Sequence, residues 1–222
     1  MSIIDGPRIV TSGLVLHLDA ANTKSYPGSG LTWTDLSGNN NTGTLTNTPT
    51  YSSANNGSIV FDGVNEYVQT SYNTQLNDFT ICSWFKSTAV AAGYFRIADK
   101  KYDTGFFFGS NNSTTLWGGG VKTSSGFNTI TLSNNAWHFL AMARTGISLT
   151  VYGDGISNTN TTVCGSGAID STILSIGATI NDGAGQRDWF TGSIAQVSIY
   201  SRVLTAAEVQ QNYNALRGRY GI

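Results

Sequence analysis

Short strand-like segments recur about every ten residues along this chain, and that spacing restricts its fold more than any other feature. In residues 14–20, LVLHLDA, leucines alternate with other residues, as in a half-buried strand. Similar segments, bounded by Gly and Asn turns, lie at 58–63, 66–70, 79–86, 94–99, 105–109, 114–118, 128–132, 137–144, 148–155, 172–177 and 190–200. Since almost no helical periodicity separates them, we predict an all-β chain folded as an antiparallel β-sandwich of jelly-roll type.

The composition excludes two classes of partner. Charged residues are only 11% of the chain, against a usual figure of about 25%, and Gly, Ser, Thr and Asn take their place. The net charge of −1 offers no attraction to nucleic acid or to an anionic membrane. No run of apolar residues approaches the ~18 that a membrane span requires. We therefore expect neither nucleic acid nor membrane as a partner.

The chain shows no linker-like segment and no repeat of fixed period, so we predict a single sandwich domain over residues 13–222. Residues 1–12, MSIIDGPRIVTS, precede the first clear strand and form an apolar arm with a Gly-Pro break. Pro7 cannot donate a hydrogen bond to a strand ladder, which disfavours a central strand. The arm is either an extra edge strand or a segment that docks on a neighbouring protein.

One helix is predicted, at the end of the chain. In RVLTAAEVQQNYNALRGRYG, Thr205 and Glu208 have the spacing of a capping box. Val209, Tyr213 and Leu216 fall on one face, and Gly218 is a plausible stop. We expect a short C-terminal helix that closes over one edge or end of the sandwich in a structural role.

The chain lacks a recognisable catalytic motif. Glu66 and Glu208 are its two glutamates, and Glu208 is used by the cap, whereas glycosidases need two carboxyls facing one cleft. His17 and His138 lie in alternating strands without a serine or cysteine motif beside either. Gly118–Gly120 precede no helix and so form no phosphate-binding loop. We therefore predict that the protein is not an enzyme.

The two cysteines do not have the spacing of a metal site. Cys82 alternates with its neighbours in a strand-like run, as a small buried residue would. A disulfide between Cys82 and Cys164 is the alternative, since sequence alone does not give the distance between them.

Sugar-binding sites combine a flat aromatic ring with polar side chains, and the loop at 100–120, KKYDTGFFFGSNNSTTLWGGG, offers both. The candidate glycan-binding residues are Tyr102, Asp103, Asn111, Asn112 and Trp117. Trp84 and Trp137 lie within apolar strands and are expected in the core, while Trp117 and Trp189 fit either packing or binding.

Residues 32–45, TWTDLSGNNNTGTL, place side-chain oxygens at alternate positions. Asp35-x-Ser37-x-Asn39 begins like a calcium-binding EF-hand loop, but Asn40 stands at the glycine position and Thr46 at the bidentate glutamate position. The alternative is a turn held by Asx-type hydrogen bonds, which the same residue types favour.

Three segments together resemble the laminin-G-like, concanavalin A-like lectin/glucanase superfamily: residues 13–45, residues 60–87 with their FDG and later W-F-K, and the closing strand and helix at 189–221. NNAWHFLAMARTGISLTVYGDG at 134–155 is similar to another element of that family. The resemblance runs in family order along nearly the whole chain. It implies the same β-sandwich fold, but it describes folding rather than activity.

The resemblance also implies a structural calcium ion held by an N-terminal strand carboxylate, the D-x-S-G-N loop and an acid in the last strand. Asp19, Asp35 and Asn39 match the first two parts. The last strand reads Ser-Ile-Ala-Gln-Val at 193–197 and supplies no carboxylate. Both calcium binding and a self-supporting Asx turn therefore stay open at this point.

The opening and closing segments, GPRIVTSGLVLHLDAANTKSYPGSG and NYNALRGRYGI, look like the version of this module found in tailed-phage structural proteins. The start of the chain also lacks a basic segment followed by an apolar one, so it does not resemble a secretory signal. A virion protein reconciles an unexported chain with a surface-like composition.

We therefore expect a non-enzymatic virion structural protein, exposed as a head decoration, a fibre or a tail appendage. Its partners would be capsid or tail proteins, further copies of itself as a homo-oligomer, and surface glycans bound weakly. The alternative is a carbohydrate-binding lectin module of a cellular surface or secreted protein.

Overall fold

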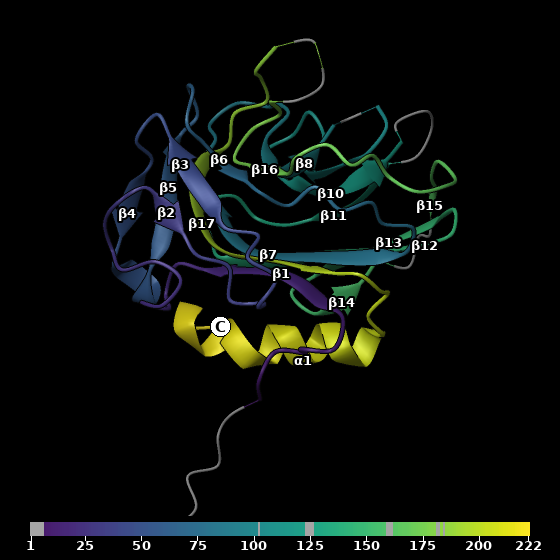
Figure 1. Cartoon of the computed structure of the whole chain (residues 1–222), viewed down its shortest axis with the longest axis horizontal. Helices are drawn as coiled ribbons and strands as arrows, with labels where there is room; N and C mark the ends of the chain where they lie inside the picture. Colours follow the sequence, from purple (N-terminus) through teal and green to yellow (C-terminus); the bar gives the residue numbers. More distant parts are fainter. Residues whose placement is uncertain (1–6, 102, 123–126, 159–161, 181–182, 184) are drawn as a thin grey trace, which may run out of the picture.

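The computed structural model describes residues 7–101, 103–122, 127–158, 162–180, 183 and 185–222. Two antiparallel sheets face each other, and one α-helix, α1, lies outside them near the C-terminus (Figure 1). The predicted fold class, an antiparallel β-sandwich of concanavalin A-like type with one short C-terminal helix, is confirmed.

The first sheet, called sheet A, contains nine strands within the described residues. Its main path runs β14-β13-β12-β7-β17-β5-β4, with β1 beside β17 and β15 beside β13. The strands are β1 (Leu14–Asp19), β4 (Thr50–Ser52), β5 (Ser58–Asp62), β7 (Phe79–Ser87), β12 (His138–Thr145), β13 (Ser148–Gly153), β14 (Ile156–Ser157), β15 (Thr162–Val163) and β17 (Thr191–Tyr200).

The second sheet, called sheet B, contains eight strands in the described part of the chain, in the order β11-β10-β9-β8-β16-β6-β3-β2. They are β2 (Thr32–Trp33), β3 (Gly43–Thr46), β6 (Tyr67–Thr70), β8 (Arg96–Lys100), β9 (Phe106–Ser110), β10 (Leu116–Val121), β11 (Phe127–Thr131) and β16 (Ser175–Ile176). The sequence pattern did not predict β2, β3, β4, β14 and β15, which are two to four residues long.

Strand β7 of sheet A is buried along almost its whole length. Phe79, Ile81 and Phe85 point between the two sheets, whereas Cys82 and Trp84 point to the opposite face. Because α1 covers that opposite face, both sides of the strand are buried, and buried and exposed positions do not alternate along it.

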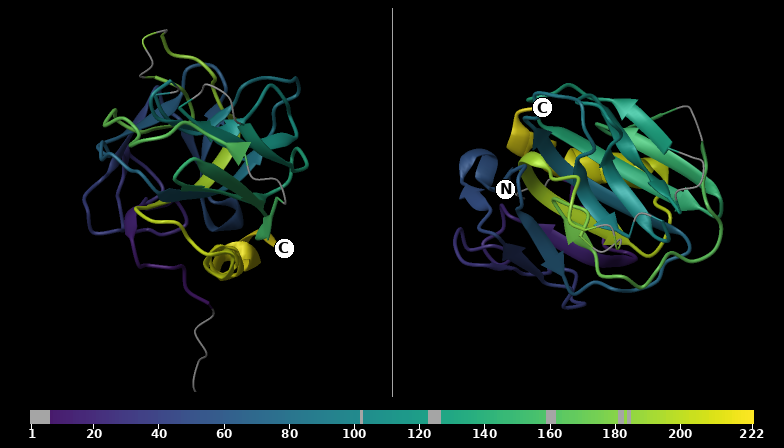
Figure 2. Two further views of the ribbon diagram at one scale, coloured as in Figure 1. Left: turned by 90° about the vertical axis from the view of Figure 1, so that its right-hand side faces the viewer. Right: turned by 90° about the horizontal axis from the view of Figure 1, so that it is seen from above.

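Helix α1 (Ala206–Leu216) begins with the predicted capping box, in which Thr205 and Glu208 each accept from the other's backbone N–H. Below it, the Trp84 ring stacks on Tyr213 and Tyr220, with centroids 5.6 and 4.3 Å apart. Figure 2 shows the helix nearly end-on, outside the two sheets. The chain continues as a 3-10 turn, η2 (Arg217–Tyr220), and its left-handed residue is Gly221 rather than Gly218.

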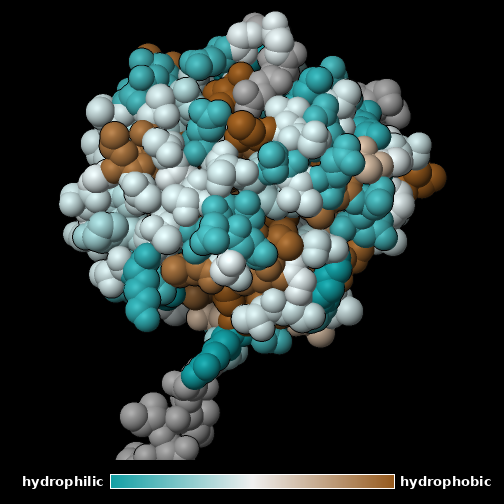
Figure 3. All heavy atoms as spheres, viewed as in Figure 1, coloured by the Kyte–Doolittle hydropathy of each residue, from teal (hydrophilic) through white to brown (hydrophobic). Residues whose placement is uncertain are grey.

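Residues 7–12, the described part of the predicted arm, form no edge strand. They run beside α1, and the buried Val10 donates its N–H to Asn212 Oδ1 at 2.8 Å. The Tyr200 hydroxyl donates to the Val10 carbonyl at 2.9 Å. Figure 3 shows hydrophobic side chains gathered on this face, where the N-terminal segment crosses β1 and α1. Residues 1–6 lie outside the described residues.

Cys82 and Cys164 are both free and buried. Cys82 belongs to the cluster under α1, and burial raises the pKa of its thiol to about 12. Cys164 belongs to the other cluster, between the sheets. Among the described residues, no helix is long and apolar enough to cross a membrane.

Candidate functional site

A groove of about 580 Å³ opens at the end of the sandwich where β7, β5 and β16 finish and β8, β6 and β17 begin. One wall is the loop 88–95 between β7 and β8, and the other consists of Gly63 and residues 188–191 before β17. Backbone hydrogen bonds hold the walls in place: Thr88 N–H donates to the Thr191 carbonyl, and Arg96 N–H to the Asp188 carbonyl, each at 3.0 Å.

The groove has an apolar and aromatic lining that faces solvent. Val90 is fully exposed, Tyr94 is 48% exposed, and Trp189 is half-buried with its ring beside Tyr67 at 6.3 Å. An apolar loop left in water loses the free energy that burial would supply, so such clusters usually mark a binding surface. This lining is the strongest sign of a ligand site on the described surface.

A fixed carboxylate stands at the side of the groove. The buried guanidinium of Arg96 contacts Asp188 Oδ2 at 2.9 Å, and Arg187 contacts the same oxygen at 2.8 Å. Arg96 also lies over the Phe107 ring at 4.5 Å and donates to the Ser110 carbonyl at 3.0 Å. Asp188 has a positive φ of 58°, a conformation that costs energy and often occurs at functional positions.

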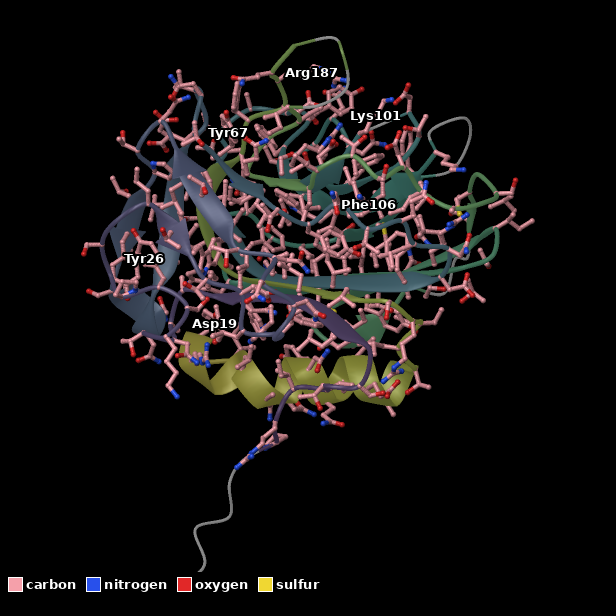
Figure 4. The ribbon with its side chains drawn as sticks, viewed as in Figure 1. Asp19, Tyr26, Tyr67, Lys101, Phe106 and Arg187 are labelled. Atoms are coloured by element: carbon pink, nitrogen blue, oxygen red, sulfur yellow. The ribbon has the colours of Figure 1, made fainter. Side chains whose placement is uncertain are left out.

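The groove continues into a second hollow of about 230 Å³, lined by Tyr94, Arg96, Phe127, Arg187 and Asp188. In Figure 4, Arg187 and Tyr67 lie on the side of the molecule away from α1, whereas Asp19 lies beside the helix. The surface that combines exposed aromatic rings with fixed charges is therefore far from the position where the sequence suggested calcium.

The structure does not bring the predicted glycan-binding residues together. Asp103 lies in the turn between β8 and β9, while Asn111 and Asn112 lie in the turn between β9 and β10. These turns sit at opposite ends of β9, roughly 17 Å apart at about 3.3 Å per residue. Tyr102 lies outside the described residues.

Trp117 is a core residue, and its assignment to a sugar site is corrected. Its side chain is 1% exposed, and its ring lies 4.5 Å from Phe85 between the sheets. Its indole N–H donates to the Thr114 carbonyl at 3.2 Å. A ring enclosed in this way presents no face to a ligand. Trp189, which the sequence left between packing and binding, lines the groove instead.

Asp35 organises the loop 32–45 by hydrogen bonds alone. Its Oδ1 accepts from the backbone N–H of His17 and Ser37 at 2.8 and 2.9 Å. Its Oδ2 accepts from the Ser37 hydroxyl and the Asn41 N–H at 2.8 and 2.9 Å. These four donors use the lone pairs that calcium would need, so this geometry favours the hydrogen-bonded turn.

The other two calcium candidates have partners of their own. Both oxygens of Asp19 accept from Arg219 Nη1 at 2.9 Å, and Ala21 N–H donates to Oδ1 at 3.0 Å. Asn39 uses its amide as a donor to the Leu14 carbonyl. Within the described part of the chain, no group of three or more His, Cys, Asp and Glu side chains could hold a metal ion. The three residues therefore do not fit a calcium site in this arrangement.

His17 lies between these carboxylates on β1 and is buried, with 8% of its surface exposed. Its Nδ1 is 2.8 Å from the Ser198 hydroxyl, and desolvation lowers the pKa of the imidazole despite the opposing effect of Asp19 and Asp35. This histidine is a packed polar residue at the inner end of the Asp35 turn.

Solved structures similar to this chain include carbohydrate-binding and receptor-binding domains. Domain 4 of an extracellular arabinanase from Geobacillus stearothermophilus, solved with arabinotriose, matches at TM-score 0.66 and 17% identity over 91% of this chain and 98% of that domain. The binding domain of botulinum neurotoxin DC, solved with SialylT, matches at TM-score 0.68 and 13% identity over 93% of this chain and 52% of that chain.

Trypanosoma rangeli sialidase, solved with sialic acid, also matches, at TM-score 0.68 and 15% identity over 98% of this chain and 36% of that enzyme. The chain thus spans about half of the neurotoxin binding domain and about a third of the sialidase. At these identities the similarity shows a shared fold.

No curated protein matches the chain by sequence. The family model Laminin_G_3, described as the concanavalin A-like lectin/glucanases superfamily, matches residues 62–210. That range begins at the last residue of β5, includes both walls of the groove and ends within α1. The chain therefore belongs to the Laminin_G_3 family of the concanavalin A-like lectin/glucanases superfamily.

Proposed function

We propose that this protein is a carbohydrate-binding module and that the groove between the loop 88–95 and Trp189 is its sugar site. The observation that carries the proposal is the pair of accessible rings, Tyr94 and Trp189, in one groove with the carboxylate of Asp188. Small-molecule sites are typically concave, largely apolar and aromatic, and supplied with a few fixed polar groups.

The chemistry of a sugar matches this lining. One face of a pyranose or furanose ring carries C–H groups that pack on an aromatic ring, and its hydroxyls need hydrogen-bond partners. Asp188 can accept from hydroxyls, and Arg96 and Arg187 hold it in place before the ligand arrives. A preorganised acceptor reduces the entropy that is lost on binding.

The similar structures support the same proposal. The arabinanase domain was solved with arabinotriose, the neurotoxin domain with SialylT and the sialidase with sialic acid. Within the described groove lining, Asp188 is the one carboxylate, whereas cleavage of a glycosidic bond uses two. We therefore propose that the groove binds saccharides without cleaving their glycosidic bonds.

The test is a screen of immobilised glycans, followed by calorimetric titration of the best oligosaccharide. The Trp189→Ala and Tyr94→Ala variants should each bind at least about tenfold more weakly, which corresponds to about 1.4 kcal/mol. Leu31→Ala removes an exposed apolar side chain outside the groove and should bind normally. Failure to bind any glycan at millimolar concentration, or full binding by both groove variants, would refute the proposal.

The second candidate is an exposed virion structural protein of a tailed phage, located in the virion. It rests on the resemblance of the first and last segments of the chain to phage modules and on the apolar surface around residues 7–15 (Figure 3). Capsid or tail proteins, or further copies of this chain, would cover that surface. Mass spectrometry of purified particles should detect the protein in many copies, and its absence from them would exclude this role.

A further inference from the structure

His138, which no serine motif accompanies in the sequence, stands between a serine and an aspartate in the structure. The Ser133 Oγ lies 2.9 Å from His138 Nε2. On the other side of the imidazole, Nδ1 lies 2.8 Å from Asp154 Oδ2. The three residues come from the β11–β12 connection, the start of β12 and the turn after β13. This order of contacts is that of a nucleophile, a base and the group that orients the base.

The carboxylate determines which imidazole nitrogen carries the proton. Asp154 Oδ2 can only accept, so the hydrogen bond to it places the proton of neutral His138 on Nδ1. Nε2 of that tautomer carries a lone pair and lies 2.9 Å from the Ser133 Oγ and 3.1 Å from the Ser133 carbonyl oxygen. Of these two oxygens only the hydroxyl can donate, so in this tautomer the hydrogen bond to Nε2 comes from the serine hydroxyl. In this tautomer the serine proton is directed at the group that would remove it.

Both flanking residues are held by the backbone. Asp154 Oδ1 accepts from the Phe139 N–H at 2.9 Å, and the Asp154 N–H donates to the Phe139 carbonyl at 2.8 Å. On the serine side, the Leu132 N–H donates to the Thr115 carbonyl, and the Asn135 N–H to the Ser87 carbonyl, both at 2.8 Å. These bonds tie the two connections that carry Ser133 and Asp154 to the backbone of neighbouring segments, as a preorganised site requires.

The serine is accessible and close to the groove. Ser133 is exposed, whereas 12% of the His138 side chain and 30% of the Asp154 side chain are accessible. The amide of the next residue, Asn134, donates to the carbonyl of Ala89, which lines the groove. A small ligand from solution can therefore reach the serine oxygen.

We propose that Ser133, His138 and Asp154 form an acyl-transfer site that cleaves small carboxylic esters. Ser133 Oγ attacks the ester carbonyl carbon while its proton passes to His138 Nε2, and the bond to the alkoxy oxygen then breaks. The alcohol leaves with that proton, and the acyl group stays on Ser133. Water, deprotonated by His138, attacks the acyl-serine and releases the carboxylic acid, which restores the serine. The sum is ester plus water to acid plus alcohol.

This activity goes beyond sugar binding and does not depend on it. Asp154 does not contact the reacting atoms and acts as a positioning residue through the tautomer of His138. General-base assistance of this kind accelerates a reaction typically by about 10²–10⁴-fold. We therefore expect slow turnover with a detectable acyl-protein, rather than the rate of a fully evolved esterase.

The experiment uses the full chain and 4-nitrophenyl acetate, with release of 4-nitrophenol followed by absorbance and the protein followed by intact-mass and peptide mass spectrometry. Wild type should gain one acetyl group, located on Ser133. Ser133→Ala and His138→Gln should lose the labelling, and Asp154→Asn should slow it at least about tenfold, since an amide does not impose the same tautomer.

Ser53→Ala, which removes an exposed serine hydroxyl outside this cluster, is the matched control and should react like wild type. Thermal melts of every variant identify loss of fold. The proposal is overturned if wild type is not acetylated, if folded Ser133→Ala is acetylated equally, or if folded Asp154→Asn reacts as fast as wild type.

Discussion

Replacing Asp35 by asparagine tests whether the loop 32–45 supports itself or depends on calcium. The carboxylate accepts four hydrogen bonds at 2.8–2.9 Å while its residue is only 8% exposed. An asparagine oxygen can keep the two donors on Oδ1, the N–H groups of His17 and Ser37. Its NH₂ group then faces the Asn41 N–H, donor against donor.

The cost follows from these contacts. Hydrogen bonds to a charged group contribute about 1.5–3 kcal/mol each, so losing the Asn41 bond and weakening the others costs about 3 kcal/mol. For a chain of this length, about 2–4 °C of melting temperature accompanies each kcal/mol. Asp35→Asn should therefore lower the Tm by about 6–12 °C, and Asp35→Ala by more, because the buried His17 N–H loses its partner.

The assay is a thermal melt of wild type and Asp35→Asn, each in millimolar calcium and in excess chelator. Asp103→Asn changes an exposed aspartate and is the matched control, with an expected change within about 0.5 kcal/mol. A self-supporting turn predicts the same difference between wild type and variant in both buffers. If chelator instead lowers the Tm of wild type and removes that difference, a bound ion holds the loop and our interpretation of Asp35 is wrong.

Three further predictions follow from single contacts. Desolvation lowers the pKa of the buried Lys100 to about 8, below its unfolded value of about 10.4. Between these pH values the unfolded chain binds more protons than the folded chain, so the stability of wild type relative to Lys100→Met should rise from pH 8 to 10. Urea titrations that give wild type and Lys100→Met the same change of stability with pH would contradict this. Deleting residues 2–12 should lower the Tm clearly because Val10 is buried, whereas deleting 2–6 keeps that contact; equal melts of both truncations would refute the packing. Arabinan and other polysaccharides should release no reducing sugar above background, since the described groove lining holds one carboxylate, and a turnover abolished by Asp188→Asn would disprove this.

The elements that the sequence predicted correctly are those with local physical causes. The capping box of Thr205 and Glu208 is complete within four residues, and α1 begins where it predicts. The long strands β7 and β17 follow from apolar runs between turns, with boundaries shifted by one residue from the predicted 79–86 and 190–200. Short strands such as β2 and β14 were not predicted, because two residues have no periodicity to detect.

The limit of local sequence patterns also explains which aromatic residues were assigned correctly and which were not. An alternating pattern shows that Trp84 is on one face of a strand, but it cannot show whether another element covers that face. Trp117 is enclosed because the two sheets meet over it. Trp189 lines an open groove whose opposite wall is the loop 88–95, so its ring remains accessible. Burial is decided by neighbours that are distant in sequence, so the sequence alone left Trp117 between packing and glycan binding.

Candidate sites depend on such distant neighbours even more strongly. The sequence by itself determined the long strands, the helix and the resemblance to the family. Only the tertiary structure placed Tyr94 beside Asp188 and Trp189, and only the pairing of β12 with β13 placed Asp154 beside His138. A strand or a helix is specified by residues a few positions apart, whereas hydrogen bonds of 2.8 Å between side chains arise from sheet register, which the packing of the whole sandwich fixes.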